Sequence, residues 1–317
     1  MKSKKLWVLL IVVAALVGVV LKMSVLYNAT YDVPAVVLGD DFQISILKQE
    51  IALNPTPGTN KMFQWAFADK RKTPLSLVSL HGFSATRKET APIPEKLAEA
   101  VHSNLFMTRL TGHGLGSDAM GKLTAEDLLK DAEESMAVAE RMGEKTVLLG
   151  TSTGALLALE MAFKYPQRVA GLILISPNFR PARADSLLLK GPLGKWIAVN
   201  YVKEHHWRAS SAEEERYWTT SYPAVALHEM MNLLSWINRR DLSTLKMPAL
   251  LFLSTEDRVV SVELIRERMK SYGGPLSTEE VTGDHVLVGD LKTPANNDAF
   301  LAKAIPFLQS LAPKAQP

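Results

Sequence analysis

One serine in this chain has the neighbours that a nucleophilic hydroxyl needs. Ser152 lies in Gly150-Thr151-Ser152-Thr153-Gly154, directly after an apolar stretch expected to be a strand (146–149) and directly before a helical pattern. A tight strand-to-helix turn presents a serine at the end of a sheet, and Gly150 and Gly154 leave room for the strained backbone. The Thr153 N–H, at the helix start, faces the same space and can stabilise an oxyanion. The alternative is a glycine-flanked turn whose serine takes no part in chemistry.

A serine hydroxyl is a weak nucleophile without a general base, and the chain offers seven histidines. His285 follows a short strand-like stretch near 279–282 and precedes the last helical pattern, so we predict it as the base. A structural loop histidine is the alternative. The other candidates lie in helical patterns or in a helical insertion: His102, His205, His206 and His228.

The acid that orients such a base is expected where a parallel strand ends. Asp257 follows the strongly apolar strand predicted at 249–253, and its rivals are Glu256 and Asp284. The chain order of Ser152, Asp257 and then His285 is the order found with this type of strand-turn-helix serine. A turn or N-cap position for Asp257 is the alternative interpretation.

The second half of an oxyanion hole is predicted after the early strand at 75–80. The sequence there reads His81-Gly82-Phe83-Ser84, and glycine lets the backbone bend so that the Phe83 N–H points into the site. A plain turn at the end of a strand is the alternative.

Together these segments resemble the α/β-hydrolase superfamily, in particular the branch of monoacylglycerol lipases, carboxylesterases and serine aminopeptidase-like proteins. The resemblance covers about residues 70–312 and departs from the family pattern at Thr111, where proline is frequent, and at Ala155, where a second glycine is frequent. It rests on His81-Gly82-Phe83, Thr111-Gly112-His113-Gly114, Gly150-Thr151-Ser152-Thr153-Gly154, Asp257-Arg258-Val259-Val260 and Gly283-Asp284-His285. It implies a serine hydrolase with a helical cap and without a cofactor or metal.

The pattern of secondary structure agrees with an α/β-hydrolase fold, a mostly parallel doubly wound sheet with an inserted helical cap. Continuous apolar strands alternate with helices near 124–143 and 153–165, as in a sheet covered on both faces. We place the hydrolase domain at 28–312, its cap at 177–246 and a tail at 313–317. The predicted strands are 43–47, 63–67, 75–80, 105–110, 146–149, 169–175 and 249–253.

The N-terminal residues predict a membrane segment. Lysines precede sixteen uncharged apolar residues at 6–21, and the apolar run resumes after Lys22. Residues 6–26 are long enough to span a bilayer, so we expect residues 1–27 to be an uncleaved signal anchor. The catalytic part would then lie on the periplasmic or extracellular side. A cleaved signal peptide, which would give a secreted protein, and a soluble core helix are the alternatives.

The formal charge of +3 does not indicate a nucleic-acid partner. Residues 1–31 hold four lysines and no acid, so the remaining residues are nearly neutral. The chain has no cysteine, which excludes thiol nucleophiles and disulfide scaffolds. Neither a dinucleotide fingerprint at 112–117 nor a zinc-protease helix at His228 is complete. The sequence predicts no oligomeric state.

The predicted substrate is a carboxylic ester with an acyl chain, such as a monoacylglycerol or a lysophospholipid, because four of the six tryptophans lie in the cap. Two alternatives stay open. A serine aminopeptidase would need an acid in the cap to hold the substrate amine, and five are available: Glu204, Glu213, Glu214, Glu215 and Glu229. A non-catalytic, membrane-anchored binding protein would use the same fold without the chemistry.

Overall fold

The computed structural model describes residues 7, 11, 18–19, 22 and 27–312. Most of the predicted anchor at 6–26 and the predicted tail at 313–317 lie outside these residues. Within the described residues, no helix combines the length and apolar character needed to cross a bilayer. The anchor therefore stays a prediction of the sequence.

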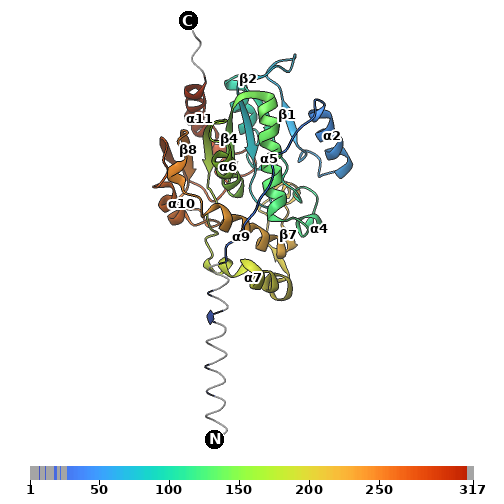
Figure 1. The fold of residues 1–317 in the computed structure, drawn as a ribbon, viewed down its shortest axis with the longest axis vertical. Coiled ribbons are helices and arrows are strands. Elements are labelled where there is room, and N and C mark those ends of the chain that lie inside the picture. Colours follow the sequence, from blue (N-terminus) through green and yellow to red (C-terminus); the bar gives the residue numbers. More distant parts are fainter. Residues whose placement is uncertain (1–6, 8–10, 12–17, 20–21, 23–26, 313–317) are drawn as a thin grey trace.

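A seven-stranded sheet forms the centre of the molecule (Figure 1). Its strands run in the order β1-β3-β2-β4-β5-β8-β9, and all neighbours are parallel except the antiparallel edge pair β1–β3. The predicted mostly parallel sheet is therefore present. The strands are β1 (Met62–Gln64), β2 (Thr73–Leu80), β3 (Asn104–Met107), β4 (Gly143–Thr151), β5 (Val169–Ile175), β8 (Ala249–Leu253) and β9 (Leu276–Glu280).

Helices cover both faces of the sheet (Figure 1). On β4, Leu148 belongs to the core that includes α5 (Ala125–Met142) and α6 (Thr153–Lys164), whereas Val147 and Leu149 belong to the core on the opposite face. That second core includes α3 (Ile93–Ala100) and α11 (Asn297–Leu311). Because successive strand residues point to opposite faces, a strand buried on both sides reads as a continuous apolar run.

Helix α5 begins where the sequence predicts. The Thr124 hydroxyl accepts a hydrogen bond from the Asp127 N–H at 3.2 Å, and the Asp127 carboxylate accepts one from the Thr124 N–H at 3.0 Å. This capping box satisfies two N–H groups that the first turn leaves without partners. The buried face of α5 includes Leu128, Ala132 and Met136.

Two predictions for the N-terminal half need correction. The strand expected at 43–47 is part of helix α2 (Phe42–Leu53). Its buried residues are Phe42, Ile46 and Glu50, and a spacing of four residues is typical of one face of a helix. The last of the three, Glu50, has a charged side chain. The strand expected at 63–67 is shorter and is the edge strand β1.

The segment between β5 and β8 is mostly helical, as the sequence predicts, but it also contains two short strands. The antiparallel pair is β6 (Glu204–His206) and β7 (Ser221–Pro223), which are three residues each and carry no clear periodic signal. The helical elements are η2 (Ala184–Leu189), α7 (Gly191–Ile197), the π-helix η3 (Ala198–Val202), α8 (Ala212–Tyr217), α9 (Val225–Ile237) and η4 (Leu242–Thr244). We refer to residues 177–246 as the cap.

The cap tryptophans do not form one apolar surface. Trp218 is buried, Trp236 is packed against the core, and Trp196 is exposed to solvent. These three tryptophans therefore have different environments, and Trp196 is the one of them that faces solvent.

The contribution of the Thr124 capping box to the stability of α5 can be tested by mutation. We expect Thr124→Ala to lower the free energy of unfolding by about 1 kcal/mol, because the Asp127 N–H loses its acceptor. Urea denaturation measures the difference. Thr124→Ser keeps the hydroxyl and is the matched control, so an equal loss in both variants would contradict the capping role.

Candidate active site

Ser152 occupies the sharp turn between β4 and α6. Its backbone has φ 54° and ψ −117°, a left-handed conformation that non-glycine residues rarely adopt. Neighbouring chain segments hold it there, because the Ser152 N–H donates to the Ile175 carbonyl at 2.8 Å and the Ser152 carbonyl accepts from the Asn178 N–H at 3.1 Å. The strained turn is thus fixed against the end of β5.

Both glycines of the motif are required by close backbone approaches. A Cβ atom on Gly154 would lie 2.1 Å from the Leu80 carbonyl oxygen, and one on Gly150 would lie 2.5 Å from the Gly154 carbonyl oxygen. Neither position can hold a larger residue without moving α6 away from β2 and β4. The predicted role of the two glycines, which is to make room for the turn, agrees with these distances.

Asp257 and His285 meet at the carboxyl end of the sheet. The His285 Nδ1 and the Asp257 Oδ2 are 2.8 Å apart, and the Asp257 side chain is almost fully shielded from solvent. The other oxygen, Oδ1, accepts the N–H groups of Val259 at 2.8 Å and Val260 at 3.0 Å. Burial alone would raise the pKa of Asp257, but the hydrogen bonds from His285 and the two amides hold it below the usual value.

The rival acids support the loops. The Glu256 carboxylate accepts the Gly283 N–H at 3.3 Å, and the Asp284 carboxylate accepts the Arg258 N–H at 3.0 Å. Asp257 is therefore the one of the three whose carboxylate contacts the His285 ring. Because Nδ1 donates to Asp257, Nε2 is the nitrogen left to accept a proton.

In the loop after β2, the Phe83 N–H is available to a ligand. The Gly82 N–H donates to Glu89 at 2.7 Å, the Ser84 N–H to the His113 Nε2 at 3.0 Å, and the Ala85 N–H to the Gly82 carbonyl at 3.3 Å. In the described part of the chain, the Phe83 N–H has no such protein acceptor. A Cβ atom on Gly82 would lie 3.3 Å from the Ser152 Cβ, so this loop passes beside the serine.

Thr153 is the first residue of α6, directly after Ser152. The first N–H groups of a helix lack partners in the preceding turn, so this amide is suited to an anion. The structure thus places the two predicted oxyanion-hole residues on the two segments that flank Ser152. Their roles in catalysis stay predictions.

Two buried histidines hold the loop in this shape. His81 and His113 each place Nδ1 2.9 Å from a backbone carbonyl oxygen, that of Gly82 and of Thr111, and each accepts a backbone N–H at Nε2. Burial lowers the pKa of His113 to about 4 and that of His81 well below its usual value. Both rings are therefore neutral at pH 7, which keeps Nε2 free to accept.

Glu89 is a residue near the site that the sequence analysis missed. Its carboxylate is 2% exposed and accepts the Gly82 N–H. Burial raises its pKa to about 7, although the Gly82 hydrogen bond and the charge of His285 both act to lower it. In the sequence, Glu89 is only an acid in a polar segment, and its position beside Gly82 depends on how the loop folds back.

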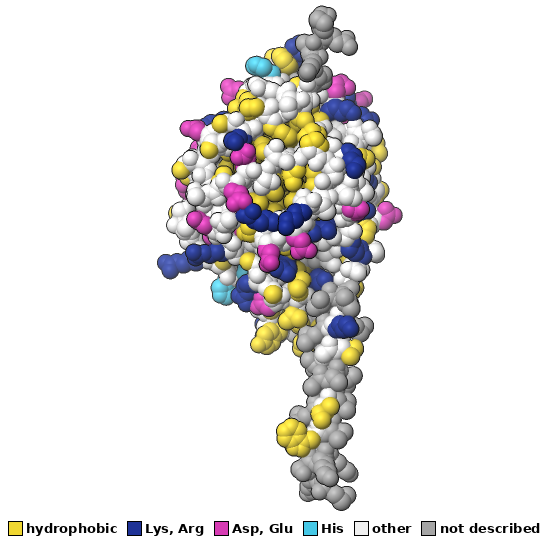
Figure 2. Space-filling model, turned by 90° about the vertical axis from the view of Figure 1, so that its left-hand side faces the viewer, with side chains coloured by type: hydrophobic (Ala, Val, Ile, Leu, Met, Phe, Trp, Pro, Cys, Tyr) yellow, Lys and Arg dark blue, Asp and Glu magenta, His cyan; other side chains and the backbone are white. Residues whose placement is uncertain are grey.

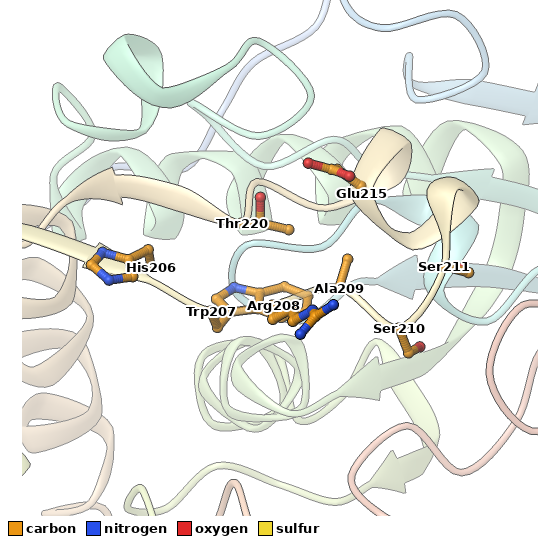
Figure 3. A pocket seen from close by; sticks show the side chains of 8 residues that line it. All are labelled: His206, Trp207, Arg208, Ala209, Ser210, Ser211, Glu215 and Thr220. Carbon is orange, nitrogen blue, oxygen red and sulfur yellow. The ribbon is translucent and has the colours of Figure 1, made fainter.

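A cavity of about 700 Å³ lies in the cap, lined by residues from His206 to Ser211 and by Glu215 and Thr220 (Figure 3). Figure 3 shows Glu215 and Thr220 on one wall and the 206–211 segment on the other. None of its lining residues belongs to the Ser152, Asp257 and His285 group. We therefore treat it as a feature of the cap and not as the reaction site.

The described residues offer no metal centre, since no three His, Asp or Glu side chains among them converge on a common point that could hold an ion. The group centred on Ser152 instead has the parts of an acyl-transfer site: a serine in a strained turn, a histidine paired with a buried carboxylate, and backbone donors. These parts lie on the loops after β2, β4, β8 and β9.

Comparison with known proteins identifies the family. Residues 72–280 match the model of Hydrolase_4, described as "Serine aminopeptidase, S33", and the chain belongs to this family. It is 26% identical over 189 residues to a thermostable monoacylglycerol lipase of Bacillus sp. (strain H-257), covering 59% of this chain and 72% of the lipase. It is also 26% identical over 256 residues to a pimeloyl-(acyl-carrier protein) methyl ester esterase of Sodalis glossinidius, covering 74% of this chain and 91% of the esterase.

Solved structures show the same fold. A structure reported with the metagenome-derived lipolytic enzymes LipS and LipT superposes with a TM-score of 0.67 at 21% identity, covering 81% of this chain and 99% of that one. A soluble variant of monoglyceride lipase from Saccharomyces cerevisiae gives a TM-score of 0.62 at 13% identity, covering 80% and 92%. The predicted α/β-hydrolase fold is thereby confirmed.

The contact between Asp257 and His285 predicts unequal effects of neutralising the three acids. We expect Asp257→Asn to lower kcat on a p-nitrophenyl ester by about 10³-fold or more, because the His285 ring loses the acceptor that orients it. Glu256→Gln and Asp284→Asn should change kcat by about threefold or less, since they support the loops from outside. Steady-state kinetics of the three variants decides. A loss in Asp284→Asn as large as that in Asp257→Asn would contradict the assignment.

The raised pKa of Glu89 predicts a pH-dependent effect on stability. A carboxyl with a folded-state pKa near 7 and an ordinary unfolded-state pKa binds its proton more tightly when folded, so it loses stabilising effect as the pH rises from about 4.5 to about 7. Glu89→Gln cannot titrate. Its free energy of unfolding relative to the parent protein should therefore increase by about 3 kcal/mol between pH 4.5 and pH 8.

Urea denaturation of both proteins across this pH range measures that increase. Asp131, whose pKa burial also raises to about 7, is present in both proteins and cancels in the comparison. A difference that stays constant with pH would contradict the raised pKa of Glu89.

Proposed function

We propose that this protein is a serine hydrolase that cleaves carboxylic esters through an acyl-enzyme. The observation that carries the proposal is the arrangement at Ser152, where a strained turn places the serine beside the Gly82–Phe83 loop, with the Asp257–His285 pair at the same end of the sheet. Membership of a hydrolase family supports it. No cofactor enters the proposed reaction.

The mechanism has two halves. His285, oriented by Asp257, accepts the proton of the Ser152 hydroxyl as the oxygen attacks the ester carbonyl, and the Phe83 and Thr153 amides stabilise the oxyanion. The imidazolium then gives its proton to the departing alcohol, which leaves an ester between the acyl group and Ser152. Water, deprotonated by the same imidazole, attacks this ester and releases the acid.

We propose esters with an acyl chain, such as monoacylglycerol or lysophospholipid, as the substrates. Support comes from relatives described as a monoacylglycerol lipase and as an esterase that acts on a pimeloyl methyl ester. Phe83 and Tyr222 of the cap pack edge to face, with ring centroids 5.9 Å apart, so apolar side chains of the cap adjoin the oxyanion loop. These side chains suit an acyl chain better than a charged amine.

A serine aminopeptidase is the second candidate, because the family description names that activity. Most of the cap acids already have partners: Glu214 pairs with Lys292, Glu229 accepts the Ala125 N–H, and Glu204 accepts the Ser221 hydroxyl. Glu215 lines the cap cavity and is the remaining acid best placed to hold a substrate amine. Glu213 is exposed.

We further propose that residues 6–26 anchor the protein in a membrane, with the hydrolase domain on the non-cytoplasmic side. The support is the sequence: a basic flank, a long apolar run and a nearly neutral remainder. A membrane anchor would bring the enzyme to lipid esters, which are scarce in water.

A substrate series separates the esterase from the aminopeptidase and from a non-catalytic protein. We expect hydrolysis of p-nitrophenyl esters to increase from acetate to octanoate or longer, and to exceed that of aminoacyl p-nitroanilides by about 10²-fold or more. Ser152→Ala should abolish both hydrolysis and labelling by a fluorophosphonate probe.

Each other outcome points to one alternative. Faster hydrolysis of the anilides, reduced by Glu215→Gln, would favour the aminopeptidase. A folded protein that hydrolyses neither series and is not labelled would favour a binding protein. Labelling that survives in Ser152→Ala would contradict the assignment of the nucleophile.

A further inference from the structure

The helix formed by α7 and η3 in the cap has its large apolar residues on the outside. Trp196 is 60% exposed, Val199 51%, Tyr201 82% and Val202 39%. We call these four residues the apolar cap face. Large apolar side chains on a globular protein usually point inward, so four of them within seven residues require a reason.

The inward side of the same helix is built from small residues. Gly191, Gly194 and Ala198 are buried, and a Cβ atom on Gly194 would lie 2.1 Å from the backbone carbon of Leu189, the last residue of η2. The helix therefore sits close to the protein through its small residues and presents its bulky apolar residues outward. This is the reverse of the usual amphipathic surface helix.

The segment that carries the apolar cap face is positively charged. Residues 190–203 include three lysines and no acid, and Lys195 and Lys203, which flank the face, are exposed. Figure 2 shows hydrophobic side chains together with basic and acidic ones at the lower end of the globular part. Exposed tryptophan and tyrosine with neighbouring lysines is the composition of a surface that rests on anionic lipid headgroups.

The N-terminal segment joins the globular part beside this face. A Cβ atom on Gly191 would lie 2.6 Å from the Tyr27 ring, so Tyr27 packs directly on the first turn of α7. The Tyr27 carbonyl also accepts the Ser235 hydroxyl at 3.2 Å, and the Ala29 carbonyl accepts the Arg239 guanidinium. Figure 1 shows the chain entering the globular part next to α7. The apolar run of the sequence ends at Leu26, one residue before this contact.

We propose that the apolar cap face lies in the interfacial layer of an anionic phospholipid bilayer and holds the cap against the membrane. The proposal rests on the membrane-anchored function proposed above. If residues 6–26 span the bilayer, Tyr27 must lie at its surface, and the contact with Gly191 then brings α7 to the same level. An acyl ester could then move from the lipid into the cap without crossing water.

The absence of cysteine makes the proposal directly testable by spin labelling. Single cysteines at Val199→Cys and Tyr201→Cys report on the face, and Ile51→Cys in α2, a site 78% exposed and away from α7 in Figure 1, is the matched control. The full chain is reconstituted into vesicles of phosphatidylcholine with phosphatidylglycerol. Oxygen, which concentrates in lipid, and a water-soluble nickel chelate then compete as relaxation agents for the label.

We expect the labels at positions 199 and 201 to be relaxed by oxygen at least about threefold more, relative to the nickel chelate, than the label at position 51. Equal ratios at all three positions would overturn the proposal. Dipolar broadening between labels at position 199, with ready access to nickel, would show that a second copy covers the face and would also overturn it. Failure of the chain to co-sediment with vesicles would overturn both the docking and the anchor.

Activity measured in the same samples distinguishes a failure of the membrane docking from a failure of the proposed esterase function. Trp196→Ser with Tyr201→Ser should lower hydrolysis of a vesicle-embedded monoacylglycerol by about tenfold and leave hydrolysis of p-nitrophenyl butyrate in water within about twofold. Equal rates for parent and variant on vesicles would overturn the docking while leaving the esterase intact. Labels in lipid on a protein that hydrolyses neither ester would uphold the docking and overturn the esterase.

Discussion

The close approach of helix α6 to strand β2 is the constraint on which the site depends. Because Gly154 has no side chain, α6 can approach β2 closely. The space between the Gly154 Cα and the Leu80 carbonyl oxygen is too small for a methyl group. This contact brings the start of α6, with the Thr153 amide, alongside the His81–Ser84 loop that follows β2. The Phe83 and Thr153 amides, which we propose as oxyanion donors, and Ser152 are therefore placed by the packing of backbone segments.

Around this contact, three buried ionisable side chains have defined hydrogen-bond partners. The neutral rings of His81 and His113 form hydrogen bonds with backbone groups of two loops. The Glu89 carboxylate accepts a hydrogen bond from the Gly82 N–H. A protonated His113 would lose its ability to accept the Ser84 N–H, so burial, by disfavouring the charged form, also protects the loop conformation. The same low-polarity surroundings that shift these pKa values strengthen hydrogen bonds to an oxyanion.

The sequence was most informative where one local pattern determines the structure. The Gly150–Gly154 turn and the continuous apolar strands depend on neighbours in the chain, and both are present. Helix α2 was misread because its buried Glu50 reads as a surface residue until its partner Arg109 is known, 59 positions later. Glu89 was missed for a similar reason. Its significance comes from a hydrogen bond to Gly82 that only the folded loop creates.

The ion pair between Lys292 and Glu214 links the cap to the segment that follows His285. Glu214 is the buried member of this pair, and its carboxylate also accepts hydrogen bonds from the Ser210 N–H and the Ser210 hydroxyl. The Glu214 side chain is buried and that of Lys292 is 26% exposed, so mobile ions screen this pair less than a fully exposed one, and a change in salt concentration alone is a weak means of releasing α8. Any opening of the cap through α8 must either break this link or pull on the loop that carries His285. Entry of a substrate by that route and the positioning of the base would then be parts of a single motion.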